Sequence, residues 1–100
     1  NNSYGGLPTE YRLHRNYPNP FNPSTLISYE LPHQADVRLT VYNVLGRVVR
    51  VLVEEPQAAG CYDVKWDGTD QNGRAVSSGV YLYRLSTKSF SASRKMLLVK

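Results

Sequence analysis

The fold is decided by the stretch STLISYELPHQADVRLTV, residues 24–41. Its apolar side chains recur at every second position, which is the period of a half-buried β-strand and not of a helix. The segment PHQA at residues 32–35 supplies a turn between two such strands. The positions expected to face a core are Thr25, Ile27, Tyr29 and Leu31 in the first strand, and Val37, Leu39 and Val41 in the second. The positions of the second strand expected to face solvent are Asp36, Arg38 and Thr40.

Short apolar runs separated by turn residues continue on both sides of this pair. Strands are expected at residues 11–15, at 47–53 with a bulge or burial on both faces, around Tyr62, Val64 and Trp66, around Tyr81, Tyr83 and Leu85, and at 90–99. Turns are expected at 43–46, 54–60, 67–79 and 87–89, with Gly46, Asp67, Gly68, Asp70, Gly73 and Gly79 as structural turn residues. About seven strands and no helical stretch predict an all-β fold, an antiparallel immunoglobulin-like β-sandwich.

The segment YPNPFNP, residues 17–23, precedes the first long strand. Proline fixes φ, removes a backbone donor and pushes the preceding residue to an extended conformation. The segment is therefore expected to be rigid, extended and outside the centre of any ladder. Tyr17 and Phe21 are expected to pin it to the core.

Length and composition exclude several classes of protein. The chain has 100 residues, which fits one domain, with residues 1–10 expected as a flexible linker from an upstream polypeptide and residues 11–100 as the domain. The net charge of +4 is spread without an arginine-rich tract, so nucleic acid is not expected as a partner. No apolar run has the length of a transmembrane segment. The single cysteine, Cys61, excludes a disulfide within these residues and a cysteine-based metal site.

Catalytic motifs are missing from the sequence. There is no GxSxG elbow, no HExxH pair and no glycine-rich phosphate loop. His14 and His33 fall in segments that are expected to be exposed, and neither lies beside a cysteine. An enzyme is therefore not expected.

Two weaker signals leave alternatives open. Asp67, Asp70 and Asn72 bring oxygen ligands together in sequence, as calcium sites do, but their spacing does not fit an EF-hand and turn chemistry is favoured. The 8 Tyr, 2 Phe and 1 Trp also suggest carbohydrate binding. Five of these aromatic residues fall on inward strand positions and are expected in the core: Tyr29, Tyr62, Trp66, Tyr81 and Tyr83.

Five sequence blocks follow one another along the chain. They are YPNPFNPST at 17–25 with ISY and LP after it, VYNVLG at 41–46, AG at 59–60 with VKWDGTD and NG within 64–73, SGVYLYRL at 78–85, and RKMLLVK at 94–100. Together they resemble the type A C-terminal sorting domain of the type IX secretion system, from about residue 13 onward. The third and fourth blocks also resemble the immunoglobulin-like part of the flagellar hook-capping protein, which is a relation of fold.

The resemblance implies a non-catalytic secretion signal without a cofactor. Such domains direct an upstream passenger, often a hydrolase, from the periplasm across the outer membrane to the cell surface of a Gram-negative bacterium. The implied partners are the outer-membrane secretion machinery, a surface sortase that cleaves within the linker (residues 1–8 are the candidate), and anionic lipopolysaccharide. The alternative is an accessory carbohydrate-binding or spacer module of an extracellular glycoside hydrolase.

Recognition is expected at the terminal block. An open strand edge there can accept an added strand, with backbone bonds for affinity and side chains for specificity. The candidate recognition residues are Arg94, Lys95, Met96, Leu97, Leu98, Val99 and Lys100.

Overall fold

The computed structural model describes residues 6–100 of the chain, so the first half of the expected linker, residues 1–5, lies outside the described residues. The described residues form seven strands and no helix, and hence none that could cross a membrane. The strands are β1 (Arg12–Leu13), β2 (Thr25–Leu31), β3 (Ala35–Tyr42), β4 (Val48–Gln57), β5 (Gly60–Trp66), β6 (Gly79–Ser86) and β7 (Ser91–Leu98).

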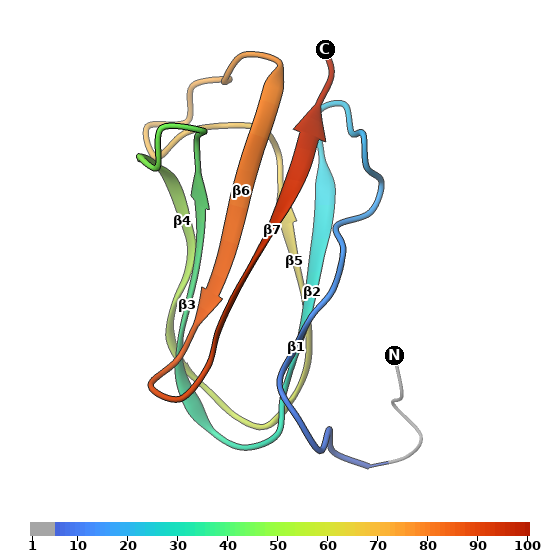
Figure 1. The fold of residues 1–100 in the computed structure, drawn as a ribbon, viewed down its shortest axis with the longest axis vertical. Coiled ribbons are helices and arrows are strands. Elements are labelled where there is room, and N and C mark those ends of the chain that lie inside the picture. Colours follow the sequence, from blue (N-terminus) through green and yellow to red (C-terminus); the bar gives the residue numbers. More distant parts are fainter. Residues whose placement is uncertain (1–5) are drawn as a thin grey trace.

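The strands form two antiparallel sheets that pack face to face, as Figure 1 shows. The smaller sheet has the order β1-β2-β5, and the larger has the order β4-β3-β6-β7. The expected β-sandwich is therefore confirmed. The segment after residue 5 lies at one end of the long axis, beside the β2–β3 and β6–β7 turns, and the last residue lies at the other end.

The core forms where the two inner faces meet. The inward positions expected in β2 and β3 are buried, and so are Trp66, Tyr81, Tyr83 and Leu85 from β5 and β6. The polar tips of the large aromatic side chains find partners at the rim: Tyr83 Oη donates to the His14 carbonyl at 2.6 Å, and Trp66 Nε1 donates to the Thr69 carbonyl at 2.9 Å. These bonds let aromatic side chains fill the core without unsatisfied donors.

β4 differs from the expectation at its C-terminal half. The predicted loop at 54–60 is wrong, because residues 54–57 continue the strand and Pro56 pairs opposite Asp36. Proline is tolerated there because β4 is an edge strand. Of the two alternatives for this strand, the bulge is confirmed: the register shifts skip Val49 and Leu52, which pack against the core.

Two side chains lie in environments opposite to those expected. Thr40 is buried on the outer face, because β3 is a central strand and Thr40 lies opposite Val51 and Arg84. The side chain of Arg38 also donates from Nε to Thr40 Oγ1 at 3.3 Å. Tyr17 is 79% exposed and does not pin its segment, whereas Phe21 is buried against Trp66.

Candidate recognition surface

The terminal block, residues 94–100, comprises the C-terminal part of β7 and the two residues after it, at the edge of the larger sheet. The period of two divides its apolar residues into two groups. Met96 and Leu98 point inward and are buried in the core, while Leu97 is 38% exposed and Val99 is 46% exposed. Only the outward residues can contact a partner without unfolding the strand.

The outer edge of β7 is partly closed by the proline-rich segment. Phe21 N donates to the Leu97 carbonyl at 3.0 Å, and Val99 N donates to the Phe21 carbonyl at 2.9 Å. The side-chain oxygen of Asn19 accepts a hydrogen bond from Leu97 N at 3.0 Å. Beyond the strand, Lys100 N donates to Ser78 Oγ at 3.0 Å. The last residues are therefore held between β6 and the segment around Phe21.

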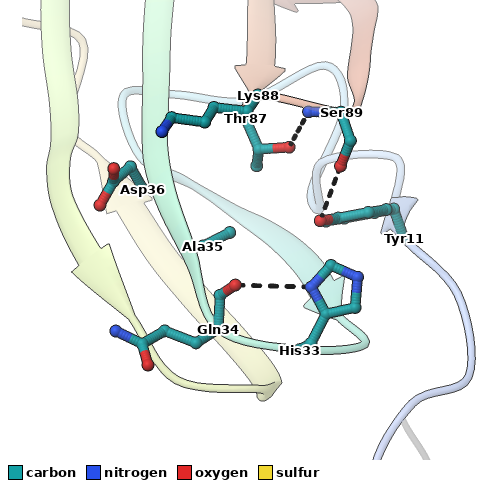
Figure 2. A pocket seen from close by; sticks show the side chains of 8 residues that line it. All are labelled: Tyr11, His33, Gln34, Ala35, Asp36, Thr87, Lys88 and Ser89. Carbon is teal, nitrogen blue, oxygen red and sulfur yellow. Dashed lines mark hydrogen bonds between the residues drawn. The ribbon is translucent and has the colours of Figure 1, made fainter.

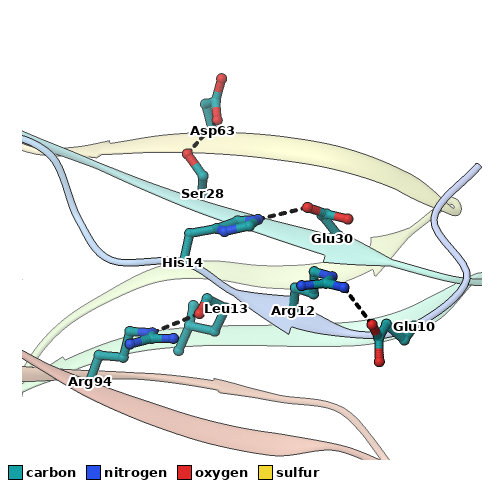
Figure 3. Close-up of polar contacts among 8 residues, drawn as sticks. All are labelled: Glu10, Arg12, Leu13, His14, Ser28, Glu30, Asp63 and Arg94. Carbon is teal, nitrogen blue, oxygen red and sulfur yellow. Dashed lines mark hydrogen bonds and ion pairs between the residues drawn. The ribbon is translucent and has the colours of Figure 1, made fainter. Parts of the chain in front are cut away.

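Arg94 links the two sheets on the side of the sandwich where their edge strands β7 and β1 lie next to each other. Its side chain donates from Nε to the Leu13 carbonyl of β1 at 2.7 Å, as Figure 3 shows. Its neighbour Lys95 is exposed and lies on the outer face. Of the three cations in the terminal block, Arg94 is thus engaged with the protein itself.

The outward side chains of β7 continue into an apolar surface on the neighbouring strands. Val80 lies opposite Leu97, and Tyr42 lies opposite both Val48 and Leu82, which in turn lies opposite Lys95. Val80 and Val48 are 41% and 52% exposed. We call this surface the terminal face, and it comprises Tyr42, Val48, Val80, Leu82, Lys95, Leu97 and Val99.

The charges of the larger sheet are unevenly distributed along its strands. The terminal face contains Lys95 and no carboxylate, and Arg84 lies one row away in β6. The acidic residues of the strands in this sheet, Asp36, Glu54 and Glu55, lie toward the opposite end. Among the strand residues, the terminal face therefore has an apolar centre with Lys95 and Arg84 at its border, and the nearest carboxylates, Asp67 and Asp70, lie in the β5–β6 loop at the same end.

The loop between β5 and β6 supports this end of the domain. Asp70 Oδ1 accepts bonds from the backbone nitrogens of Asn72 and Arg74, at 2.9 and 3.0 Å. Asp67 accepts from the Thr69 hydroxyl, and this bond lowers the pKa of Asp67. These carboxylates are engaged in turn bonds, and within residues 6–100 there is no cluster of three or more His, Cys, Asp or Glu side chains that could hold a metal ion.

Gly68 is the turn residue that contacts the terminal strand most directly. It has φ +76, and a Cβ there would lie 3.1 Å from the Pro23 carbonyl and 3.7 Å from the Leu98 side chain. Only glycine fits both the backbone conformation and this close approach. The other three expected turn glycines, Gly46, Gly73 and Gly79, also have positive φ, as do Gly6 and Gly60.

The opposite end carries a shallow hollow, which Figure 2 shows. It has a volume of about 370 Å³, and its lining includes Tyr11, His33 and Lys88. The Tyr11 ring is stacked on Phe90 with centroids 4.8 Å apart, and it meets the His33 ring at 85°. Because its ring is already packed by two others, Tyr11 offers little of the open aromatic surface on which a sugar ring would stack.

A histidine–carboxylate pair lies on the outer face of the smaller sheet, also visible in Figure 3. His14 Nε2 lies 2.7 Å from Glu30 Oε2. The nearby Ser28 hydroxyl donates to Asp63 and not to His14. A serine nucleophile needs its base within hydrogen-bond reach, so these four side chains form two separate pairs, one of which contains the buried Glu30.

Sequence reasoning missed the part of the surface that lies outside the terminal block. Val80 and Leu82 alternate with the inward Tyr81 and Tyr83, so their outward direction could have been deduced from the period of β6. The closure of the β7 edge by Asn19 had no sequence signal, because the two segments lie 78 residues apart.

Comparison with solved structures identifies related folds. The chain superposes on dimeric latent PorU from Porphyromonas gingivalis with a TM-score of 0.70 and 23% identity, covering 95% of this chain and 10% of PorU. It superposes on PorZ, a surface component of the type IX secretion system of the same organism, with a TM-score of 0.61 and 21% identity, covering 88% of this chain and 11% of PorZ. At these identities the likeness shows a shared fold.

FlgD from Pseudomonas aeruginosa has the higher identity, 28%, with a TM-score of 0.58 over 74% of this chain and 57% of that protein. The chain thus spans about a tenth of PorU and PorZ and little more than half of FlgD. A sequence search among curated proteins found no match. Residues 19–91 match the FlgD Ig-like domain family, and the chain belongs to that family.

Proposed function

We propose that this domain is a non-catalytic secretion signal that directs an upstream passenger across the outer membrane by the type IX system. The observation that carries the proposal is the terminal block. It forms the C-terminal part of β7 and the two residues after it, and its outward side chains, Lys95, Leu97 and Val99, are exposed on the folded domain. PorZ, a component of that secretion system, contains a domain of the same fold, which supports the assignment.

The placement of the two ends suits this role. The described chain enters the fold beside the β2–β3 turn, and β7 finishes at the opposite end of the long axis. A passenger attached ahead of residue 6 would extend away from the terminal face. The secretion machinery could then approach the terminal face while the passenger is still attached.

In our proposal the partners act one after another during export. The outer-membrane machinery binds the folded domain in the periplasm, and the surface sortase then cleaves ahead of the fold. The passenger, a hydrolase in our proposal, is transferred to anionic lipopolysaccharide and remains at the cell surface.

Export of a reporter tests the proposal. A reporter fused to residues 7–100 is expressed with an N-terminal periplasmic signal in a host that has the type IX machinery and in the same host without it. We expect the reporter at the surface only in the first host, measured by its cleavage with external protease. A folded fusion that stays in the periplasm of both hosts contradicts the proposal and favours the accessory-module alternative.

Deleting residues 96–100 is a poor control, because it removes Met96 and Leu98 from the core. Loss of export would then report unfolding as readily as loss of a signal. Point substitutions at outward positions avoid this problem.

A further inference from the structure

The proposed function leaves open how a partner would read the terminal strand, and the structure restricts the choice. Strand addition needs unpaired backbone groups along an edge. In β7 both backbone groups of Leu97 are bonded to the proline-rich segment, as is Val99 N. A strand added beside the last residues would first have to displace residues 19–21.

The edge that stays open is the other half of β7. In an antiparallel ladder alternate residues direct both backbone groups to the same side. Since the Leu97 groups face away from β6, those of Lys95 and Ser93 do so as well. No backbone bond outside the ladders involves either residue within the described part of the chain. This open stretch has serine and lysine side chains, and lysine on an edge opposes pairing with another strand.

The side chains of the terminal block are presented differently. Leu97 and Val99 stand on the outer face, where Val80 and the row of Val48, Tyr42 and Leu82 extend the apolar surface onto three other strands. Those four residues lie between 42 and 82 in sequence, so the surface exists only when the domain is folded. A linear peptide with the sequence of β7 would not reproduce it.

The charge pattern indicates the chemistry of a partner. Lys95 lies within the terminal face, Arg84 lies beside it, and the carboxylates of these strands lie toward the far end. A complementary surface has apolar side chains at its centre and carboxylates at the border. An apolar centre surrounded by a polar border is typical of interfaces between two proteins. A lipid surface is favoured by protruding Trp and Phe side chains, whereas Trp66 and Phe21 are buried here.

We propose that the terminal face is a composite docking surface for a protein partner with an apolar centre and an acidic border, and that this partner reads side chains across β3, β4, β6 and β7. The inference rests on the proposed secretion function. It differs from the expected strand addition in that residues outside the terminal block carry part of the recognition.

The test compares substitutions at exposed positions, where a new charge is expected to change the free energy of unfolding little. Val80→Glu and Leu97→Glu introduce a carboxylate into the terminal face, and Lys95→Glu reverses its charge. Leu26→Glu is the matched control, because Leu26 is 45% exposed near the start of β2 on the other sheet. Each variant is placed in the reporter fusion of residues 7–100, and its unfolding midpoint is measured on the purified protein.

Val80→Glu is the decisive variant, because Val80 lies outside the terminal block. We expect it to lower the surface fraction of the reporter at least tenfold, as Leu97→Glu does, with export of Leu26→Glu unchanged. Export of Val80→Glu at the level of the intact fusion would overturn the composite surface while leaving the secretion function standing. Failure of the unsubstituted fusion to reach the surface would instead contradict the secretion function itself.

Two further measurements separate the kinds of partner. Substituting Ser93→Pro removes an outward backbone donor and keeps the outer-face side chains, so export should persist; its loss in a folded variant would indicate strand addition. The purified domain should not sediment with vesicles containing phosphatidylglycerol. Sedimentation that is abolished by Leu97→Glu would identify a lipid surface as the occupant and overturn the protein partner.

Discussion

Leu97 and Leu98 are adjacent leucines of β7 with opposite environments, and this difference predicts opposite effects of the same substitution. Leu98 is fully buried between the sheets, whereas Leu97 is 38% exposed on the terminal face. Replacing a buried leucine by alanine removes its transfer free energy and leaves a cavity, which costs about 2–5 kcal/mol. At an exposed position the change in the free energy of unfolding is within about 0.5 kcal/mol.

Urea unfolding measures both variants. The fluorescence of Trp66, which is buried in the core, reports the transition. With a slope of about 1–3 kcal/mol per molar urea, a loss of about 3 kcal/mol lowers the midpoint by roughly 1–3 M. We therefore expect Leu98→Ala to shift the midpoint by that amount and Leu97→Ala to leave it nearly unchanged. Equal shifts for the two variants would refute the assignment of inward and outward residues in the terminal strand.

Three further predictions concern the parts that hold the terminal strand in place. Phe21→Ala should cost about 3–5 kcal/mol, whereas Tyr17→Ala in the same segment should cost less than about 0.5 kcal/mol, both measured by urea unfolding; similar losses would mean that Tyr17 also anchors the segment. Gly68→Ala should cost about 1–3 kcal/mol for its positive φ, and more than Gly73→Ala, since only Gly68 has the Pro23 carbonyl within 3.1 Å of an added Cβ; an equal loss of thermal stability in both would show that the close contact does not matter. Burial raises the pKa of Tyr29 to about 12, so its stabilising contribution is complete below the unfolded value near 10 and is lost as pH rises toward 12. Tyr29→Phe should flatten the fall in thermal midpoint between those pH values, and an unchanged pH dependence would contradict this account.

The inner faces of the sandwich were predictable from the sequence because they depend on a local rule. A period of two places Ile27, Leu39 and Tyr83 toward one core wherever each strand begins. The irregularity of β4 was predictable in the same way, because a run of apolar residues that does not alternate fits either a bulge or burial on both faces. The missed half of β4 has a different cause: its Glu54, Glu55 and Pro56 have the composition of a loop, and only an edge position makes them acceptable in a strand.

The remaining features depend on contacts between distant segments. Thr40 was expected on the solvent face, but its burial comes from Val51 and Arg84 on neighbouring strands, which no local pattern reveals. Likewise, the terminal block was recognised as one continuous sequence motif, whereas its residues have different structural roles in the fold. Met96 and Leu98 are core, Arg94 ties the sheets together, and the exposed remainder joins Val80 from β6.

The secretion function is tested most directly by a comparison of two domains of the same family in one export assay. The same reporter is fused to residues 7–100 of this chain and, separately, to the Ig-like domain of P. aeruginosa FlgD, which shares its fold at 28% identity. Both fusions are expressed in a host with the type IX machinery, and folding of each is verified by its unfolding transition. We expect only the fusion with this chain to reach the surface. Equal surface fractions, or a folded fusion of this chain that remains in the periplasm, would contradict it.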